Sequence, residues 1–350
     1  MKIAIIHHQF AAKGGMETYL LNLVNGFGLD QDSVDIFTFR KDKNLTVPAN
    51  CRVYEKKIFL PKSLRKFYFM QDINKNFRKE KYDISLSLTR TASQNIVICG
   101  GTHKGYLHHF NKAPLLKDFI ELYFEKKCYR LSPHIMAHSK LVQKELEEFY
   151  NVDPKKIVLL YPPINTEKFA PNIRKDREHL KIKFGIDSTK TALLFPSTGH
   201  RRKGWFELYD AFKNLPQDKF TLIIAGNRPS NLVSDLPNIK FMGFVNEMAA
   251  LYAACDFTIL PSHYEPFGLV VIESLQCGTP VIISSMVGAS DFVGPNEGII
   301  FDGINSKNII DSIKKACECN FNIAPNFATL HNLTIKHHIA QIKRICTQYD

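Results

Sequence analysis

The sequence predicts an α/β protein made of two successive, doubly wound halves, and three observations lead to this prediction. The chain has 350 residues, which at roughly 150 residues per domain corresponds to two domains. Hydrophobic residues make up 45% and charged residues 23%, a globular balance that excludes a disordered or low-complexity chain. Apolar runs of strand length alternate with helical stretches from end to end. Because these runs are continuous, we expect strands buried on both faces of parallel sheets.

The first half, residues 1–165, is predicted to be one α/β domain. We expect its strands at Ile3–Ile6, Val34–Phe39, Ile84–Leu88, Ile96–Cys99, His134–Ala137 and Ile157–Leu160. We expect its helices at Gly15–Phe27, Leu64–Arg78, Leu115–Arg130 and Lys140–Tyr150. Tyr161–Asn165, with two prolines, interrupts the pattern, and the polar stretch Lys168–Lys190 follows it. We therefore expect the linker between the domains there.

The second half, residues 166–330, repeats the alternation of strands and helices. We expect strands at Ala192–Phe195, Phe220–Ala225, Ile239–Met242, Phe257–Leu260, Val281–Ser284 and Gly298–Phe301. We expect helices at Gly204–Lys213, Glu247–Ala254, Gly268–Cys277 and Ser306–Cys317. Residues 331–350 form one more amphipathic helix, which we expect to pack back on the first half. Two such halves predict two Rossmann-like domains facing a cleft at the carboxyl ends of their strands.

The sequence predicts a cytoplasmic protein with reduced cysteines. No apolar run approaches the ~18 residues of a membrane-spanning helix, and Ile3–Ile6 is too short for the core of a signal peptide. The eight cysteines are scattered singly, without a Cys-x-x-Cys pair. Several of them, including Cys99, Cys255 and Cys277, lie in apolar surroundings, which favours core thiols over disulfides.

Positive charge is concentrated in the first half of the chain. The net charge is +12, of which +10 lies in residues 1–164. Residues 40–81 carry 13 basic and 4 acidic residues. Five of these cations, together with four apolar residues, suit the anionic inner leaflet of a membrane: Lys56, Lys57, Lys62, Arg65 and Lys66 with Phe59, Leu60, Phe67 and Phe69. We expect peripheral docking through residues 40–81; the alternative is a solvated basic face.

Several short motifs are disqualified by their spacing. The run Ala12–Met16 contains Gly-Gly but not Gly-x-Gly-x-x-Gly, so a nicotinamide fold is unsupported. Gly199–Gly204 begins like a P-loop, but Trp205 stands where that loop requires lysine. His134 and His138 would lie ~13 Å apart along a strand, too far to share a metal. We therefore predict no metal site.

Three segments carry candidate binding residues. Gly14 and Gly15 precede a helix, where bare backbone can approach a ligand, although a plain turn explains them equally well. Glu265 precedes the helix that begins near Gly268, and Glu273 lies inside it. Their carboxylates and the first amides of that helix, those of Phe267, Gly268, Leu269 and Val270, would bind the hydroxyls and phosphates of one ligand.

The alternative for Glu265 and Glu273 is a capping side chain and a surface side chain. Arg202 and Lys203 precede Gly204 and a helix start, which suits a diphosphate. A solvated basic turn is the competing interpretation of that pair.

Taken together, these segments resemble the retaining family-four glycosyltransferases of GT-B fold over nearly the whole chain. The resemblance is carried by Gly14-Gly15-Met-Glu17, His138-Ser139-Lys140, Tyr161-Pro-Pro-Ile-Asn165-x-x-x-Phe169, Arg202-Lys203-Gly204, Ile224-Ala-Gly226, Phe241-x-Gly243, Cys255-Asp256, Glu265-Pro-Phe-Gly268-x4-Glu273 and Gly278-x-Pro280-Val281 followed by Gly288. Of these, the two glutamates around Pro-Phe-Gly are the family's most specific signature.

The resemblance implies a role for each residue. Arg202 and Lys203 would neutralise the diphosphate of the donor, and Glu273 would hold its ribose. Glu265, with Pro266 and the amides of Phe267 to Val270, would hold the transferred sugar. Gly243 and Phe244 would lie along the base, and Gly14 and Gly15 would close on the diphosphate. His103 occupies the place of the family's active-site histidine and would orient the sugar. The resemblance also implies that Arg202, Lys203 and Glu265 act in catalysis.

The resemblance also implies the reaction, transfer of a hexose from a UDP-sugar to a glycan or glycolipid acceptor without metal or cofactor. One departure is that Thr198 stands where many members have an arginine. Arg202 is instead adjacent to Lys203, and this local arrangement, together with the basic first half of the chain, resembles the lipopolysaccharide core glucosyltransferase branch of the family. Two alternatives remain, a nucleotide-sugar epimerase and a non-enzymatic basic protein that binds nucleic acid. The spacing of Glu265 and Glu273 around Pro-Phe-Gly argues against the epimerase, and a nucleic-acid-binding protein would leave this motif without a purpose.

Overall fold

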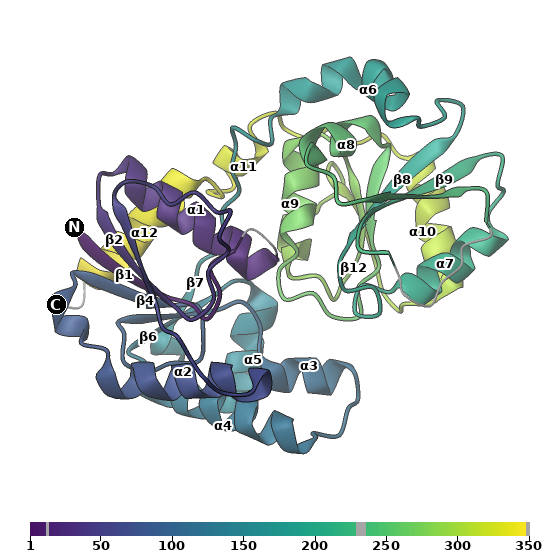
Figure 1. The fold of residues 1–350 in the computed structure, drawn as a ribbon. Helices are drawn as coiled ribbons and strands as arrows, with labels where there is room; N and C mark the ends of the chain where they lie inside the picture. Colours follow the sequence, from purple (N-terminus) through teal and green to yellow (C-terminus); the bar gives the residue numbers. More distant parts are fainter. Residues whose placement is uncertain (12–13, 229–235, 348–350) are drawn as a thin grey trace. The chain divides into compact units, whose positions relative to one another are not determined.

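The computed structural model describes residues 1–11, 14–228 and 236–347 and consists of two compact units (Figure 1). Unit 1 comprises residues 1–163 together with 333–350, and unit 2 comprises residues 164–332. The division falls two residues before the boundary expected at residue 165. Each unit contains one parallel sheet covered by helices, so the predicted α/β class with two parallel sheets is confirmed.

Unit 1 is built on a seven-stranded sheet in the order β3-β2-β1-β4-β5-β6-β7. Its strands are β1 (Lys2–Ile6), β2 (Ser33–Thr38), β3 (Cys51–Glu55), β4 (Ile84–Ser87), β5 (Ile96–Cys99), β6 (His134–Ala137) and β7 (Ile157–Leu159). Six of these strands match the predicted apolar runs closely. The seventh, β3, escaped prediction because it is an edge strand with exposed Arg52, Tyr54 and Glu55 and has no apolar run.

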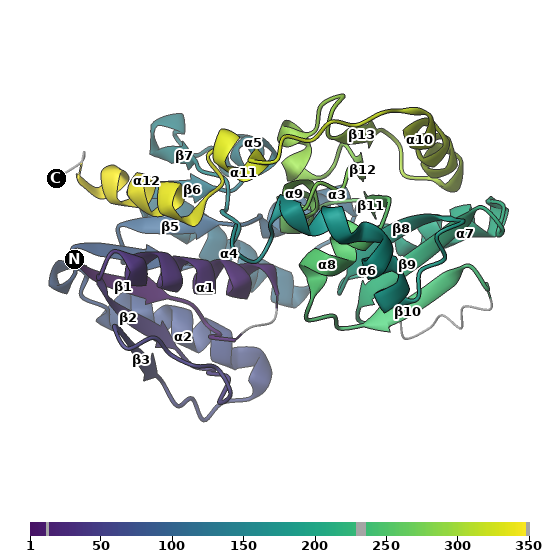
Figure 2. The ribbon, with the colours of Figure 1, turned by 90° about the horizontal axis from the view of Figure 1, so that it is seen from above.

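The helices of unit 1 are α1 (Gly15–Leu29), α2 (Lys62–Asn76), α3 (His103–His109), α4 (Leu116–Leu131), α5 (Lys140–Tyr150) and α12 (Ile335–Thr347). Figures 1 and 2 both show α12 beside α1. The contact depends on Gly26, where a Cβ would lie 2.5 Å from Ile339 and 2.6 Å from Ile335. The predicted helix 331–350 in fact begins at Ile335, and its last three residues lie outside the described part of the chain.

Unit 2 is built on a six-stranded sheet in the order β10-β9-β8-β11-β12-β13. Its strands are β8 (Thr191–Ser197), β9 (Phe220–Gly226), β10 (Ile239–Gly243), β11 (Phe257–Leu260), β12 (Val281–Ser284) and β13 (Gly298–Phe301). Its helices are α6 (Arg177–Phe184), α7 (Trp205–Asn214), α8 (Met248–Ala254), α9 (Leu269–Gln276), α10 (Ser306–Glu318) and α11 (Phe327–Leu330). Because β8 and β11 are neighbours, the loops after them lie at the same sheet edge.

The expectation that Lys168–Lys190 is a linker is wrong. This stretch contains a 3-10 turn (Pro171–Asp176) and α6, which packs against α8. Leu180 and Ile186 are buried in the core of unit 2, and Arg177 forms an ion pair with Asp256. The stretch misleads because only a narrow stripe of α6 faces the core, so polar residues dominate its composition.

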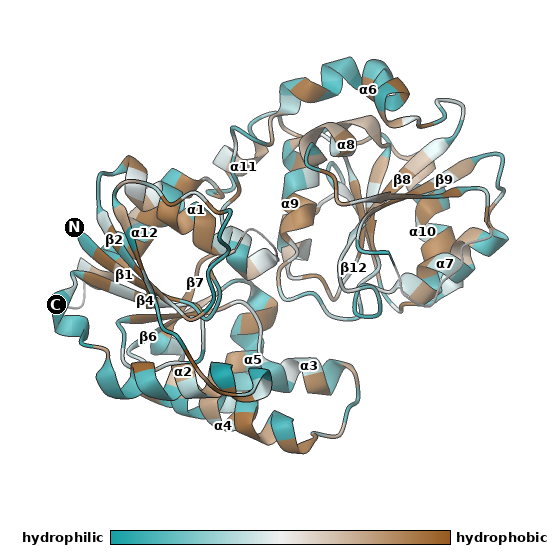
Figure 3. Ribbon diagram, viewed as in Figure 1, coloured by the Kyte–Doolittle hydropathy of each residue, from teal (hydrophilic) through white to brown (hydrophobic). Residues whose placement is uncertain are grey.

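The core of each unit lies against its sheet. Figure 3 shows hydrophobic residues along the central strands and hydrophilic ones on the outer helix faces. Cys99, Cys255 and Cys277, expected in the core, are buried. Phe69 and Phe77 are buried as well, in a cluster with Ala4, Ile6 and Ile73. The expectation that Phe69 belongs to a membrane-docking face is therefore wrong, because that face of α2 packs on the sheet.

Among the described residues, no helix has the length and apolarity that crossing a membrane requires.

Candidate active site

Two adjacent cations lie at the carboxyl end of β8 in unit 2. Lys203 is 8% exposed, and its Nζ donates a hydrogen bond to the carbonyl of Pro196 at 2.9 Å. Arg202 Nη1 donates to the carbonyl of Tyr264 at 2.8 Å. Burial lowers the pKa of Lys203, while the nearby carboxylate of Glu265 acts in the opposite direction. A buried ammonium with little compensating charge is suited to bind an anion.

A glycine holds this loop against the next strand. Gly204 has φ +74°, and a Cβ there would lie 1.9 Å from the carbonyl oxygen of Pro261. The loop after β8 can therefore approach the loop after β11 only with glycine at this position. As a result, Arg202 and Lys203 lie next to Glu265.

The carboxylate of Glu265 is shared by both cations. Its Oε2 lies 2.8 Å from Arg202 Nη1 and 3.9 Å from Lys203 Nζ. The backbone of Glu265 is fixed by a hydrogen bond from its N–H to the carbonyl of Met286 and by one from Gly288 N–H to its own carbonyl. The structure thus brings together three of the predicted site residues. Their formal charges leave one positive charge over, which suits an anionic ligand.

Helix α9 begins at Leu269, at the end of the loop that carries Glu265. Gly268, with φ +94°, is its N-cap and offers no side-chain cap. The first amides of a helix have no acceptor within the helix, and here those of Leu269 and Val270 occupy that position. Pro266 and Phe267 form the turn before them, with Phe267 buried. Free amides and the positive end of the helix dipole stabilise negatively charged or strongly accepting groups.

Glu273 lies on α9 in different surroundings from Glu265. Its Oε2 accepts a hydrogen bond from the hydroxyl of Tyr252 at 3.0 Å. Burial raises the pKa of Glu273, and Tyr252, Lys168 and Lys203 act against this rise. The two glutamates are therefore not equivalent: one is paired with cations, and the other is partly exposed and accepts from a phenol.

Two buried hydroxyls at this edge were missed by the sequence analysis. Ser197 is the last residue of β8, and Ser262 follows β11 by two residues. The Oγ atoms of both are buried and have no hydrogen-bond partner among the described residues. A buried hydroxyl without a partner costs about 1–3 kcal/mol, which a bound polar ligand would recover. The available signal was their position directly after apolar strands, where parallel sheets bind ligands.

Gly243 and Phe244 lie apart from the charged cluster. Gly243 is the last residue of the edge strand β10, and Phe244 follows it; β10 is separated from β8 by β9. Gly243 has φ +67° with open space where a Cβ would point, and Phe244 is 68% exposed. An exposed aromatic ring beside open backbone is suited to lie along a flat ligand such as a base.

The predicted site residues of unit 1 follow the strands of the other sheet. Gly14, with φ +108°, is the N-cap of α1, and Gly15 opens the helix. His103 is the first residue of α3, whose N-cap Thr102 accepts a hydrogen bond from Gly105 N–H. The backbone around His103 follows the carboxyl end of β5.

Two carboxylates hold His103, and neither was predicted from the sequence. Its Nε2 lies 2.9 Å from Asp118 Oδ1, and its backbone N–H donates to both oxygens of Glu125 at 2.8 and 3.0 Å. Glu125 is fully buried and also pairs with Arg90 at 2.7 Å. The pKa of Asp118 is lowered mainly by the hydrogen bond from the backbone amide of Leu115 and, to a smaller extent, by the hydrogen bond with His103. A buried ion pair and a charged partner thus fix the orientation of the imidazole.

Comparison with known proteins gives the class of the chain. Residues 13–168 match the family described as Glycosyltransferase Family 4, and residues 176–329 match Glycosyl transferases group 1. A probable transglycosylase of Burkholderia thailandensis is 32% identical over 340 residues, which cover 94% of this chain and 92% of that relative. The chain belongs to glycosyltransferase family 4 and is a glycosyltransferase that uses a nucleotide sugar.

Solved structures agree on the fold. WaaG, a glycosyltransferase involved in lipopolysaccharide biosynthesis, has a TM-score of 0.78 at 15% identity, covering 99% of this chain and 95% of that one. HepE of Anabaena, in complex with UDP and glucose, has a TM-score of 0.75 at 18% identity, covering 99% and 100%. The predicted GT-B fold is confirmed.

Proposed function

We propose that this protein is a retaining hexosyltransferase that moves a hexose from a UDP-sugar to a glycan or glycolipid acceptor in cell-surface polysaccharide or lipopolysaccharide synthesis. The observation that carries the proposal is the cluster of Arg202, Lys203 and Glu265 beside the first turn of α9. It combines surplus positive charge for a diphosphate with carboxylate and amide groups for a sugar. The UDP and glucose bound by HepE support this choice of donor.

The cations act on the leaving group. As the bond between the sugar C1 and the diphosphate oxygen breaks, its electron pair moves to the diphosphate, and Arg202 and Lys203 stabilise the growing negative charge. The acceptor hydroxyl forms the new bond to C1 on the same face, and its proton passes to the departing phosphate. Because the lysine is buried, its interaction with that charge is stronger than it would be in water.

The remaining residues bind and orient the donor in this proposal. Glu265, Pro266 and the amides from Phe267 through Gly268 and Leu269 to Val270 hold the transferred sugar. Glu273 accepts from the ribose, and Gly243 with Phe244 lies along the base. From unit 1, we assign Gly14 and Gly15 to the diphosphate and His103 to the sugar, with Asp118 and Glu125 as positioning residues for His103.

The same cations make a divalent metal at the diphosphate unnecessary in this proposal. The test combines a thermal-shift screen of UDP-, GDP- and ADP-sugars with a transfer assay in excess EDTA. We expect the UDP-sugar to give the largest stabilisation and transfer to continue in the chelator. An absolute requirement for a divalent ion would overturn the assigned role of Arg202 and Lys203. Stabilisation by another nucleotide alone would overturn the choice of donor.

We further propose that unit 1 docks on an anionic membrane at the cytoplasmic face, where a glycolipid acceptor is found. Within residues 40–81, Phe59 is 92% exposed and Lys57 and Lys62 are exposed, whereas Lys56 pairs with Asp72 and Lys66 with Glu121. The paired lysines are less available to lipid headgroups, so this segment supplies fewer free cations than its composition suggests.

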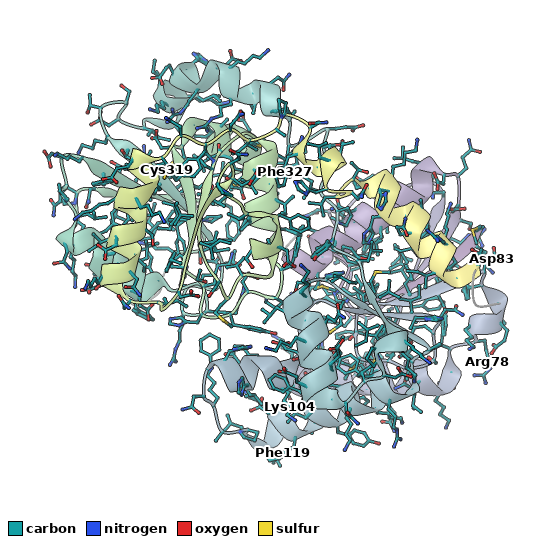
Figure 4. The ribbon with its side chains drawn as sticks, turned by 180° about the vertical axis from the view of Figure 1, so that it is seen from behind. Arg78, Asp83, Lys104, Phe119, Cys319 and Phe327 are labelled. Carbon is teal, nitrogen blue, oxygen red and sulfur yellow. The ribbon has the colours of Figure 1, made fainter. Side chains whose placement is uncertain are left out.

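Helix α4 extends the proposed docking surface. Leu116, Phe119 and Tyr123 on this helix are each more than half exposed, and Figure 4 shows Phe119 at the outer edge of unit 1. A cavity of about 740 Å³ on the same helix is lined by four cations: Lys104, Lys126, Arg130 and Lys156. None of the four pairs with a carboxylate among the described residues. Each such cation near an anionic surface contributes about 1 kcal/mol.

Sedimentation with vesicles tests the docking surface. We expect binding to vesicles containing an anionic phospholipid, weak binding to neutral vesicles, and loss of binding at high salt. Leu116→Ser combined with Phe119→Ser is expected to reduce binding. The matched control is Ile182→Ser with Leu330→Ser, which removes exposed apolar residues from unit 2 instead. Equal recovery in the supernatant with both vesicle types would contradict the proposal.

A further inference from the structure

We propose that unit 1 contains a binding site for one divalent transition-metal ion of the zinc type, held by His7, His8 and Glu17. One ligand atom from each of these three residues lies within 4.8 Å of the other two. All three ligands belong to unit 1, and the proposal does not depend on the proposed reaction. The sequence analysis excluded metal on the basis of other histidines and missed this group.

The fold brings the three residues together at the first strand. His7 and His8 directly follow β1, and the N–H of His7 donates to the carbonyl of Phe37 on β2 at 3.0 Å. The centroids of the two imidazole rings lie 4.3 Å apart, and the rings have an edge-to-face arrangement. Glu17, in the first turn of α1, completes the group, with Oε1 3.7 Å from His7 Nε2. His7 and His8 thus lie at the start of the loop that leaves β1, and Glu17 is held by the first turn of α1.

Gly14 makes room for the carboxylate. A Cβ at this position would lie 2.3 Å from Oε2 of Glu17, so a larger residue would displace the side chain. A glutamate in the first turn of a helix commonly folds back to accept from the N-cap backbone. Here α1 has no side-chain cap, and the Glu17 carboxylate points toward His7 instead.

The polar atoms of this group lack partners that would explain their burial. His7 is 2% exposed, and both of its ring nitrogens are buried without a hydrogen bond among the described residues. The Nδ1 atom of His8 is likewise buried and has no hydrogen-bond partner among the described residues. The 3.7 Å separation between Glu17 and His7 exceeds hydrogen-bond distance. Unpaired buried nitrogens are costly, and a coordinated cation would satisfy one on each ring.

The donor set determines which ion fits. Two neutral imidazoles and one carboxylate suit Zn²⁺ and its first-row neighbours, whereas Ca²⁺ and Mg²⁺ prefer oxygen ligands. Three protein ligands leave a fourth position for water. Three basic side chains act on His8 electrostatically: Lys66, Arg90 and Arg40. Lys66 pairs with Glu121 and Arg90 pairs with Glu125, and these carboxylates weaken the repulsion that the two cations would exert on a bound metal ion.

Metal binding to the purified, tag-free chain tests the proposal without donor or acceptor. After treatment with EDTA and its removal, equilibrium dialysis against Zn²⁺ is expected to yield one ion per chain. Co²⁺ is expected to give the visible absorption of a four-coordinate site. Glu17→Gln should weaken Zn²⁺ binding by about tenfold or more while changing little of the shape of the side chain. His7→Gln and His8→Gln should have the same effect or a larger one.

The control is His179→Gln, which removes an exposed histidine from α6 and should leave binding unchanged. Loss of a buried imidazole can unfold unit 1, so the fold of each variant is checked by circular dichroism in EDTA. If the histidine variants fail to fold, the Glu17→Gln variant decides, because Glu17 is partly exposed. Absence of stoichiometric binding, or binding that survives Glu17→Gln at full strength, would overturn the site. Either result leaves the transfer reaction untouched, because no step of the assay uses a sugar nucleotide.

Discussion

The two units arrange charged side chains differently at the same edge of their sheets. In unit 2, Arg202 and Lys203 share the single carboxylate of Glu265, so positive charge is left over. In unit 1, two cations near His8 each have a carboxylate of their own, Arg90 with Glu125 and Lys66 with Glu121. Unequal pairing leaves unit 2 ready to bind an anion, whereas in unit 1 the paired Glu125 also accepts from the backbone N–H of His103 and fixes its position.

The largest effect is expected from the unpaired charge of unit 2. Removing one of its cations, in Lys203→Ala or Arg202→Ala, should lower the transfer rate by ~30- to ~1000-fold, since stabilising a developing charge contributes about 2–4 kcal/mol. Steady-state kinetics with a UDP-sugar would measure the loss. Arg201→Ala is the matched control, because Arg201 is the exposed neighbour of the same loop. An equal loss in the control would mean that any basic residue in the loop suffices.

The second prediction concerns how the stability of unit 1 depends on pH through its buried histidines. In unit 1, burial lowers the pKa of His138 and of His338 to about 3. The unfolded chain therefore binds more protons than the folded one between pH 6.5 and about 3, and stability should fall as the pH drops through this window. Each histidine contributes about 1.4 kcal/mol per pH unit over that range.

Urea unfolding at pH 7 and pH 5 would measure this dependence. His338→Gln should make it shallower, whereas the exposed His179→Gln in unit 2 should leave it unchanged. A pH dependence that is the same in both variants would contradict the assignment to buried histidines of unit 1.

The third prediction tests whether the two glutamates of unit 2 differ as their surroundings suggest. Glu273→Ala should weaken UDP binding by about tenfold to a hundredfold, as expected for loss of a hydrogen bond to a charged group. Glu265→Ala should leave UDP binding nearly unchanged and lower turnover. Calorimetry with UDP and with the intact donor would distinguish the two. If both variants weaken UDP equally, the division of roles is wrong.

The smallest effect is expected where α12 packs on α1. Gly26→Ala should destabilise unit 1 by about 1–3 kcal/mol, because a Cβ there would overlap with Ile335 and Ile339. Gly28→Ala, two residues away, meets only the side chain of Asn50 at 3.3 Å and should be neutral or stabilising by up to about 1 kcal/mol. Thermal unfolding of both variants would measure the difference. Equal effects would show that the close contact with α12 is unimportant for stability.

Much of the fold could be predicted from the sequence because its signals are local. A continuous apolar run such as Ile96–Cys99 or Val281–Ser284 identifies a strand buried on both faces, and both match the observed bounds. The spacing of Glu265 and Glu273 around Gly268 likewise places one carboxylate before a helix and the other inside it. Strands without such a run, as in β3, and polar helices such as α6 had no comparable signal.

The sequence by itself determined the two parallel sheets and the short motifs of unit 2, because each depends on neighbouring residues and on burial alone. Only the tertiary structure decided which distant side chains meet. Asp118 and Glu125 reach His103, Glu17 turns toward His7, and Phe69 faces the sheet. These contacts depend on how helices rotate as they pack against a sheet, and composition does not encode that rotation.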